Sequence, residues 1–203
     1  MTLPEVVLLI FWGIFLFYWT INWKNVKPTK ERRFSIVSLR GGIFLILALL
    51  LIDRFTLHNS LHLPACQWTW VGCNFLAHSS PTQSIFAGTV SVLLGAAGLT
   101  VAVLARRTLG RNWSSGLDVK QGHELVTRGV YAYIRHPIYA GLLLLLLATL
   151  IQYRSVLEVF ICIIVFVVIL FRLTAEERLM THTFPKEYPQ YMKQTKRLIP
   201  FIW

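Results

Sequence analysis

The sequence of 203 residues is poor in charge and in cysteine. Charged side chains make up 14% of it, whereas a soluble domain has about 25%. This shortage argues against an ordinary soluble domain. The three cysteines form no metal-ligand spacing with each other or with the six histidines, so we expect no metal site. The sequence also lacks internal repeats and low-complexity segments, which leaves a single membrane domain as the simplest organisation.

Apolar residues fill most of the remaining sequence, with 55% hydrophobic residues and a mean hydropathy of +0.58. Several apolar runs approach or exceed the roughly 18 residues that are typical of membrane helices. They predict an all-α integral membrane protein with five transmembrane helices, at Leu3–Trp23, Phe34–Ile52, Ile85–Ala105, Ile138–Tyr153 and Ser155–Leu173. The first run has no basic start and no small-residue cleavage site, so we expect a retained helix and not a signal peptide.

The last two predicted helices are separated by only a few residues around Arg154, which predicts a tight antiparallel helical hairpin. The fifth helix is expected to continue beyond the membrane as far as Phe184, before Pro185, and to lead into a C-terminal cytoplasmic extension. Residues 1–84 are interpreted as a transmembrane scaffold of two helices and an outer loop. Residues 85–203 contain the polar residues discussed below and are interpreted as the cofactor-binding catalytic region.

The formal net charge of +11 would suit nucleic acid, but the placement of the charge argues against it. Of the 20 basic residues, 18 lie in three segments that alternating helices bring to one side, and the segment 59–84 has none. This positive-inside pattern places the N-terminus outside and the C-terminus in the cytoplasm. The basic side would favour anionic membrane lipids. Cys66 and Cys73 fall on the outer loop, where their spacing does not decide between a disulfide and two free thiols.

A polar and aromatic segment, residues 123–139, runs directly into the fourth predicted helix. Polar groups at a membrane are costly and therefore often functional. Considered alone, His136 is interpreted as an interfacial histidine. Arg172 and Glu176, considered alone, are interpreted as an exposed helical ion pair. A tight hairpin would nevertheless bring His136, Tyr139, Arg172 and Glu176 into one pocket. Such a pocket suits a zwitterionic, cationic cofactor that has a carboxylate, an ammonium and an adenine.

The same residues resemble the isoprenylcysteine carboxyl methyltransferase family. The similarity comprises Leu109–Ser114, His123–Val126, Gly129–Tyr131, Arg135–Gly141, Arg172, Glu176–Glu177, Phe184, Glu187–Tyr188, Tyr191 and Ile199–Ile202. The resemblance implies a methyltransferase that uses S-adenosyl-L-methionine. It places the cofactor contacts on His123, Glu124, Leu125, Val126, Tyr131, His136, Pro137, Ile138, Tyr139 and Glu176. It places the catalytic, substrate-facing arginine on Arg172. The first 84 residues carry no motif of this family.

The sequence therefore predicts methyl transfer to the carboxylate of an isoprenoid-linked or other lipophilic substrate at the cytoplasmic membrane face. A methyltransferase for phospholipid amines or small thiols, from the same superfamily, is the nearest alternative because it shares the cofactor site. An NADPH-dependent sterol-type reductase and a membrane scaffold without enzymatic activity are alternatives of other classes. Membrane lipids and a lipophilic substrate are the expected partners, and neither nucleic acid nor metal is expected.

Overall fold

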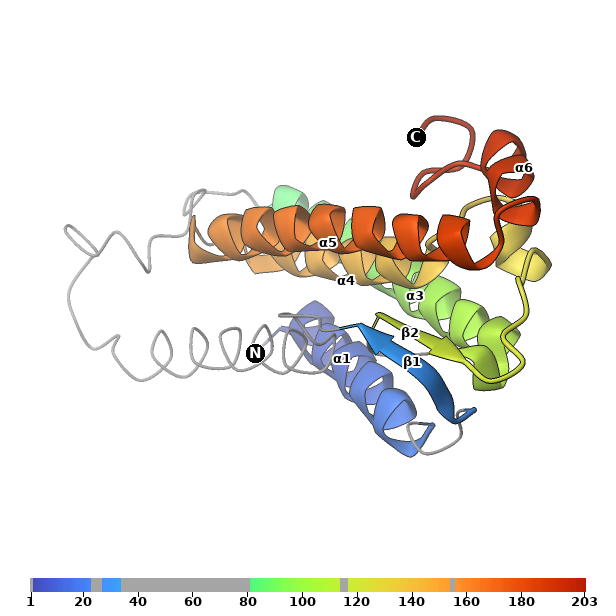
Figure 1. Cartoon of the computed structure of the whole chain (residues 1–203). Coiled ribbons are helices and arrows are strands. Elements are labelled where there is room, and N and C mark those ends of the chain that lie inside the picture. Colours follow the sequence, from blue (N-terminus) through green and yellow to red (C-terminus); the bar gives the residue numbers. More distant parts are fainter. Residues whose placement is uncertain (1, 23–26, 34–80, 114–116, 154–155) are drawn as a thin grey trace.

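The computed structural model describes residues 2–22, 27–33, 81–113, 117–153 and 156–203. Four long helices dominate these residues: α1 (Leu3–Ile21), α3 (Pro81–Leu109), α4 (Pro137–Tyr153) and α5 (Val156–Thr183) (Figure 1). A short helix, α6 (Glu187–Gln194), follows α5. The predicted second helix, Cys66 and Cys73 lie outside the described residues.

Three of the described helices, α1, α3 and α5, are long and apolar enough to cross a membrane. Helix α4 is apolar but has only 17 residues, about 25 Å at 1.5 Å per residue, against a hydrocarbon core of about 30 Å. The helical membrane character is therefore confirmed. The number of five transmembrane helices stays a prediction, because the second of them lies among residues that the structure does not describe.

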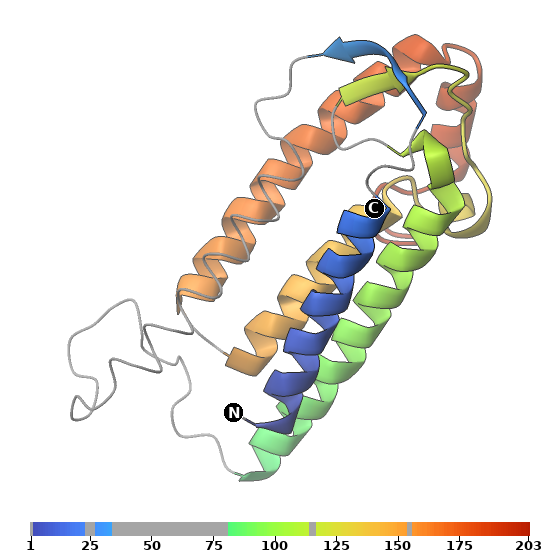
Figure 2. The same ribbon diagram turned by 90° about the horizontal axis from the view of Figure 1, so that it is seen from below.

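Side-chain contacts at both ends of the bundle fix the direction of its helices. Arg106, near the end of α3, donates to the backbone oxygen of Asn22 after α1, at 2.8 Å. At the opposite end, Gln152 at the end of α4 hydrogen-bonds to Ser91 on α3 at 3.1 Å and to Thr2 before α1 at 3.4 Å. Helices α1 and α3 thus run in one direction and α4 runs in the other (Figure 2).

Helices α3 and α4 approach each other closely because glycines face each other at their crossing. A Cβ atom added to Gly141 would lie 2.5 Å from the backbone oxygen of Gly98 and 2.8 Å from the backbone nitrogen of Ala102. Small residues of this kind let membrane helices pack at short distances. Helix α1 joins this pair through the Trp12 indole, which donates to Thr149 Oγ1 at 3.1 Å.

A two-stranded antiparallel sheet, which the sequence did not predict, lies at the basic end of the bundle. Strand β1 (Thr29–Arg33) pairs with β2 (Leu117–Lys120), so that Arg33 lies opposite Leu117. Both strands are short and contain few apolar residues, so neither carries the alternation that predicts a strand. The sheet links the segment after α1 to the segment after α3, across the boundary at residue 84. The division into two regions at that boundary stays a prediction.

Helix α5 follows α4 with only residues 154–155 between them, and the two helices contact each other along their length. Cys162 Sγ lies 3.9 Å from the backbone oxygen of Leu146, and Arg172 Nε lies 2.6 Å from the Tyr139 hydroxyl. Helix α5 ends at Thr183, as predicted from Pro185. The chain then turns through α6 and returns to the start of α4.

Candidate functional site

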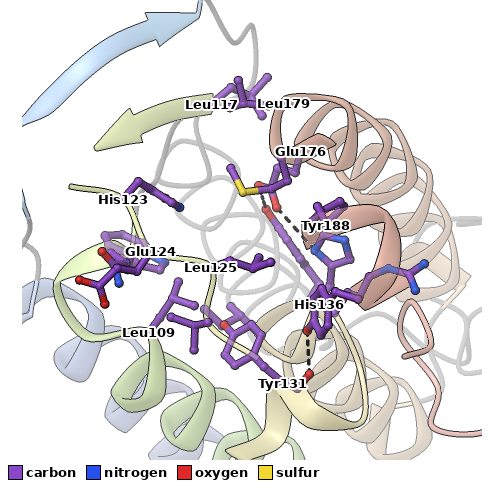
Figure 3. A pocket seen from close by; sticks show the side chains of 18 residues that line it. Leu109, Leu117, His123, Glu124, Leu125, Tyr131, His136, Glu176, Leu179 and Tyr188 are labelled. Carbon is purple, nitrogen blue, oxygen red and sulfur yellow. Dashed lines mark hydrogen bonds and ion pairs between the residues drawn. The ribbon is translucent and has the colours of Figure 1, made fainter. Parts of the chain in front are cut away.

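A cavity of about 150 Å³ lies where the start of α4, the last turns of α5 and helix α6 meet (Figure 3). Loop residues His123 and Glu124 lie on one side of it, and Glu176, Tyr188 and His136 lie on the other. The complete lining is Leu109, Asn112, Trp113, Leu117, His123, Glu124, Leu125, Val126, Tyr131, Arg135, His136, Ile138, Tyr139, Glu176, Leu179, Met180, Tyr188 and Tyr191. The lining is thus mainly apolar and aromatic with a few charged groups, as in small-molecule sites.

Nine of the ten residues predicted to contact a cofactor line this cavity, namely His123, Glu124, Leu125, Val126, Tyr131, His136, Ile138, Tyr139 and Glu176. The tenth, Pro137, is fully buried as the first residue of α4, where its missing N–H costs nothing. The Glu124 side chain is 77% exposed, and its carboxylate lies 3.5 Å from Lys27 Nζ. Glu124 therefore borders the cavity at its solvent side.

A chain of short polar contacts joins Tyr139, Glu176 and Arg172. The Tyr139 hydroxyl donates to Glu176 Oε1 at 2.6 Å and accepts from Arg172 Nε at 2.6 Å. Arg172 Nε lies 3.0 Å from the same Glu176 oxygen. Arg172 is only 6% exposed and Glu176 is partly buried. The pair therefore differs from the exposed ion pair of small value that the sequence spacing alone suggests. Arg172 lies behind Tyr139 and Glu176, and in the described part of the chain it is not among the lining residues.

His136 lies between two carboxylates of α5. Its Nδ1 is 3.6 Å from Glu176 Oε2, and its Nε2 is 3.2 Å from Glu177 Oε1. Glu177 is also held by Arg135 Nε at 2.9 Å and by an Arg197 guanidinium nitrogen at 2.8 Å. The histidine ring is thereby fixed in orientation, with the Glu176 side toward the cavity.

Residues just before α4 are also held through their backbone by the segment after α6. The Arg135 N–H donates to the Lys196 oxygen at 2.8 Å, and the His136 N–H donates to the Arg197 oxygen at 3.2 Å. The Lys196 N–H in turn donates to the Tyr133 oxygen at 3.2 Å. These bonds give the start of α4 a fixed position beneath the cavity.

Three tyrosines of the lining stay protonated at physiological pH. Burial raises the pKa of Tyr131 and of Tyr188 well above the ordinary value, and it raises the pKa of Tyr191 to about 12. The Tyr191 hydroxyl donates to the Tyr131 backbone oxygen at 2.7 Å, which ties α6 to the loop before α4. The tyrosines thus provide neutral aromatic walls, and Glu176 supplies a carboxylate among them.

Sequence reasoning assigned no role to several residues that complete the site. Glu177 follows Glu176 directly but faces another direction, and it contacts Arg135 and His136. Leu117 reaches the cavity through the unpredicted strand β2. Tyr188 and Tyr191 belong to the similarity motif, but their place in the lining depends on the turn between α5 and α6.

The fold and this cavity define a helical membrane protein with a cavity at one end that aromatic and acidic residues help to line. The sequence model of the isoprenylcysteine carboxyl methyltransferase (ICMT) family matches residues 88–182, which include most of the cavity lining. Through these residues the chain is similar to this family.

Among the similar curated proteins are three methyltransferases. The protein-S-isoprenylcysteine O-methyltransferase of Schizosaccharomyces pombe is 36% identical over 39% of this chain and 34% of its own length. The corresponding enzyme of Rattus norvegicus is 30% identical over 73% of this chain and 48% of its own. A probable one of Oryza sativa subsp. indica is 28% identical over 58% of this chain and 61% of its own. The chain thus spans less than two thirds of each of these relatives.

A solved structure of a eukaryotic intramembrane Ras methyltransferase of the same family is also similar. It has a TM-score of 0.45 and 21% identity, over 83% of this chain and 69% of that chain.

Proposed function

We propose that the chain transfers a methyl group from S-adenosylmethionine to the carboxylate of an isoprenoid-linked or other lipophilic substrate, giving a methyl ester at the cytoplasmic membrane face. The observation that carries the proposal is the juxtaposition of His136, Tyr139 and Glu176 in one cavity, with Arg172 directly behind them. Similarity to a family whose members include proteins named protein-S-isoprenylcysteine O-methyltransferases supports the same reaction.

The chemistry of the lining fits a cationic, zwitterionic methyl donor. The Glu176 carboxylate would hold the positive groups, and His136 at the start of α4 would face the carboxylate, because a helix N-terminus favours anions. Leu125, Val126 and the tyrosines offer apolar and aromatic walls for an adenine. When bound, S-adenosylmethionine would supply an electrophilic sulfonium methyl group.

From the size of the cavity we infer that its walls would move when the donor binds. A cavity of about 150 Å³ is smaller than the roughly 300–1,000 Å³ that is common for ligand sites. Residues 123–126 form a loop between β2 and the 3₁₀ turn at Gly129–Ala132, and they are not held in a helix or strand. We infer that this loop moves outward to admit the donor from the cytoplasmic side.

In this proposal Arg172 would hold an acceptor that arrives from the membrane. It lies one helical turn before Glu176 on α5, next to Phe171, which is 76% exposed on the apolar surface of the helix. A carboxylate is already ionised at pH 7 and needs no base to attack a methyl group. The task of the protein is then to align the reactants, and a guanidinium can hold a carboxylate through two parallel hydrogen bonds.

Cofactor titration of the reconstituted protein tests the proposal. S-adenosylmethionine should bind and NADPH should not. Replacing His136 or Glu176 by Ala should weaken the affinity by about 1–3 kcal/mol, because a partnered polar group is lost. Glu187→Ala, which removes an exposed glutamate of α6, is the matched control and should leave the affinity unchanged. Unchanged affinity in both site variants, or preferential binding of NADPH, would contradict the proposal.

An assay with a labelled methyl donor distinguishes between the possible classes of methyl acceptor. A prenylated cysteine, a phosphatidylethanolamine and a small thiol form the panel of acceptors. An amine acceptor must first lose a proton and has no need of an arginine clamp, so we expect label in the prenylated carboxylate. Label only in the amine or the thiol would move the chain to the other branch of the superfamily while keeping its cofactor site.

A further inference from the structure

The segment after α6 presents a surface that combines exposed apolar and exposed basic side chains. Phe201 and Ile202 are 85% and 74% exposed, and Met192, Ile199 and Trp203 are exposed as well. Lys193 and Lys196 are exposed beside them. An exposed cluster of large apolar residues usually marks an interaction site. The proposed methyl transfer makes no use of the exposed side chains of residues 192–203, which we call the tail surface.

The apolar side chains of the tail surface are held outward by a closed turn. The N–H groups of Leu198 and Ile199 donate to the Trp203 oxygen at 2.9 and 2.7 Å, and the Trp203 N–H donates to the Ile199 oxygen at 3.1 Å. Leu198 is buried and anchors the turn on the protein. The turn therefore presents Phe201 and Ile202 to the surroundings in a fixed geometry.

Contacts with α5 place the tail surface at the end of the membrane-spanning stretch. An Arg197 guanidinium nitrogen lies 3.0 Å from Thr174 Oγ1 and 2.8 Å from Glu177 Oε2. Thr174 comes one turn after Phe171, the last strongly exposed apolar residue of α5. In Figure 1 the tail turns back from α6 over α5, toward the apolar part of the helix. The turn thus lies at the level where the exposed apolar surface of α5 ends.

We propose that the tail surface docks on the anionic headgroup layer of the membrane in which the helices lie. Aromatic and aliphatic side chains of the turn would enter the interface, where such residues are favoured. Lys193 and Lys196 would face lipid phosphates, whose negative potential attracts basic residues near the membrane. The proposed partner is thus a lipid surface of opposite charge, and the position of the turn along α5 brings that surface within reach.

A fluorescent probe at Ile202 tests the docking in the full-length protein. Ile202→Cys, in a background without the native cysteines, is labelled with an environment-sensitive fluorophore. The protein is then reconstituted into vesicles of phosphatidylcholine with and without phosphatidylglycerol. In the anionic vesicles the emission should shift to the blue and be quenched by lipids that carry a spin label near the headgroup. The same probe at Gln121, exposed in the turn after β2, is the control and should emit as in water.

Neutralising the two lysines separates the electrostatic contribution to docking from the contribution of the apolar side chains. Lys193→Gln with Lys196→Gln should lower the ratio of docked to undocked probe about fivefold for each lysine in anionic vesicles, and should have no effect in neutral ones. Unchanged thermal unfolding shows that the variant is folded. Emission at Ile202 equal to that at Gln121 in both vesicle types would overturn the proposal. A blue shift that depends neither on lipid charge nor on the two lysines would overturn it as well.

Discussion

At the scale of single residues, Arg172 is the side chain whose substitution distinguishes an acceptor clamp from an ion-pair partner. Arg172→Lys keeps a positive charge near Glu176 but lacks the planar, two-pronged guanidinium. If Arg172 holds the acceptor carboxylate, we expect cofactor affinity to survive and methyl transfer to fall by orders of magnitude. Affinity and turnover are to be measured on the same preparation.

Arg178→Lys provides the matched control for this prediction. Arg178 is exposed on the same helix, less than two turns from Arg172, and should tolerate the exchange in both measurements. Near-normal turnover of Arg172→Lys would reduce Arg172 to a structural partner of Glu176. The preference for a carboxylate acceptor would then lose its main support, whereas the cofactor site would be unaffected.

At the scale of helices, the crossing of α3 and α4 depends on two glycines. Gly141→Ala would place a Cβ atom 2.5 Å from the Gly98 oxygen, so the helices must separate. Overpacking of this kind costs about 1–3 kcal/mol, and we expect a lower unfolding temperature in detergent. Gly13→Ala on α1 is the control, because its added Cβ would have no heavy atom within 4 Å. Equal unfolding temperatures for the two variants would contradict the close packing.

Much of the helical part of the site could be predicted from the sequence. Tyr139 lies in the first turn of α4, and Arg172 and Glu176 are four residues apart on α5, so a short connection between the two helices brings them together. Leu117 could not be predicted, because its position depends on strand pairing between distant, charged segments. The role of Glu177 also depends on tertiary structure, since its partners Arg135 and Arg197 come from two other parts of the chain.

At the scale of the whole molecule, the orientation in the membrane is open to a direct test. The basic residues predict that the segment 59–84 faces outside and that the cavity faces the cytoplasm. Single cysteines at Gln67 and Gln121, in a background without Cys66, Cys73 and Cys162, should be labelled from opposite sides by an impermeant maleimide. Permeabilised cells, in which both should react, are the control. Labelling of both sites from outside would refute the orientation.

The hydrogen bonds that hold the start of α4 determine the stage of synthesis at which the cavity can be completed. The N–H groups of Arg135 and His136 donate to oxygens of Lys196 and Arg197. Synthesis runs from the N-terminus, so α1, α3, α4 and α5 can enter the bilayer before those oxygens exist. His136 gains its final backbone partner only when residue 197 has left the ribosome. A nascent chain arrested before that point would already hold these membrane helices, but its cavity would still be unfinished.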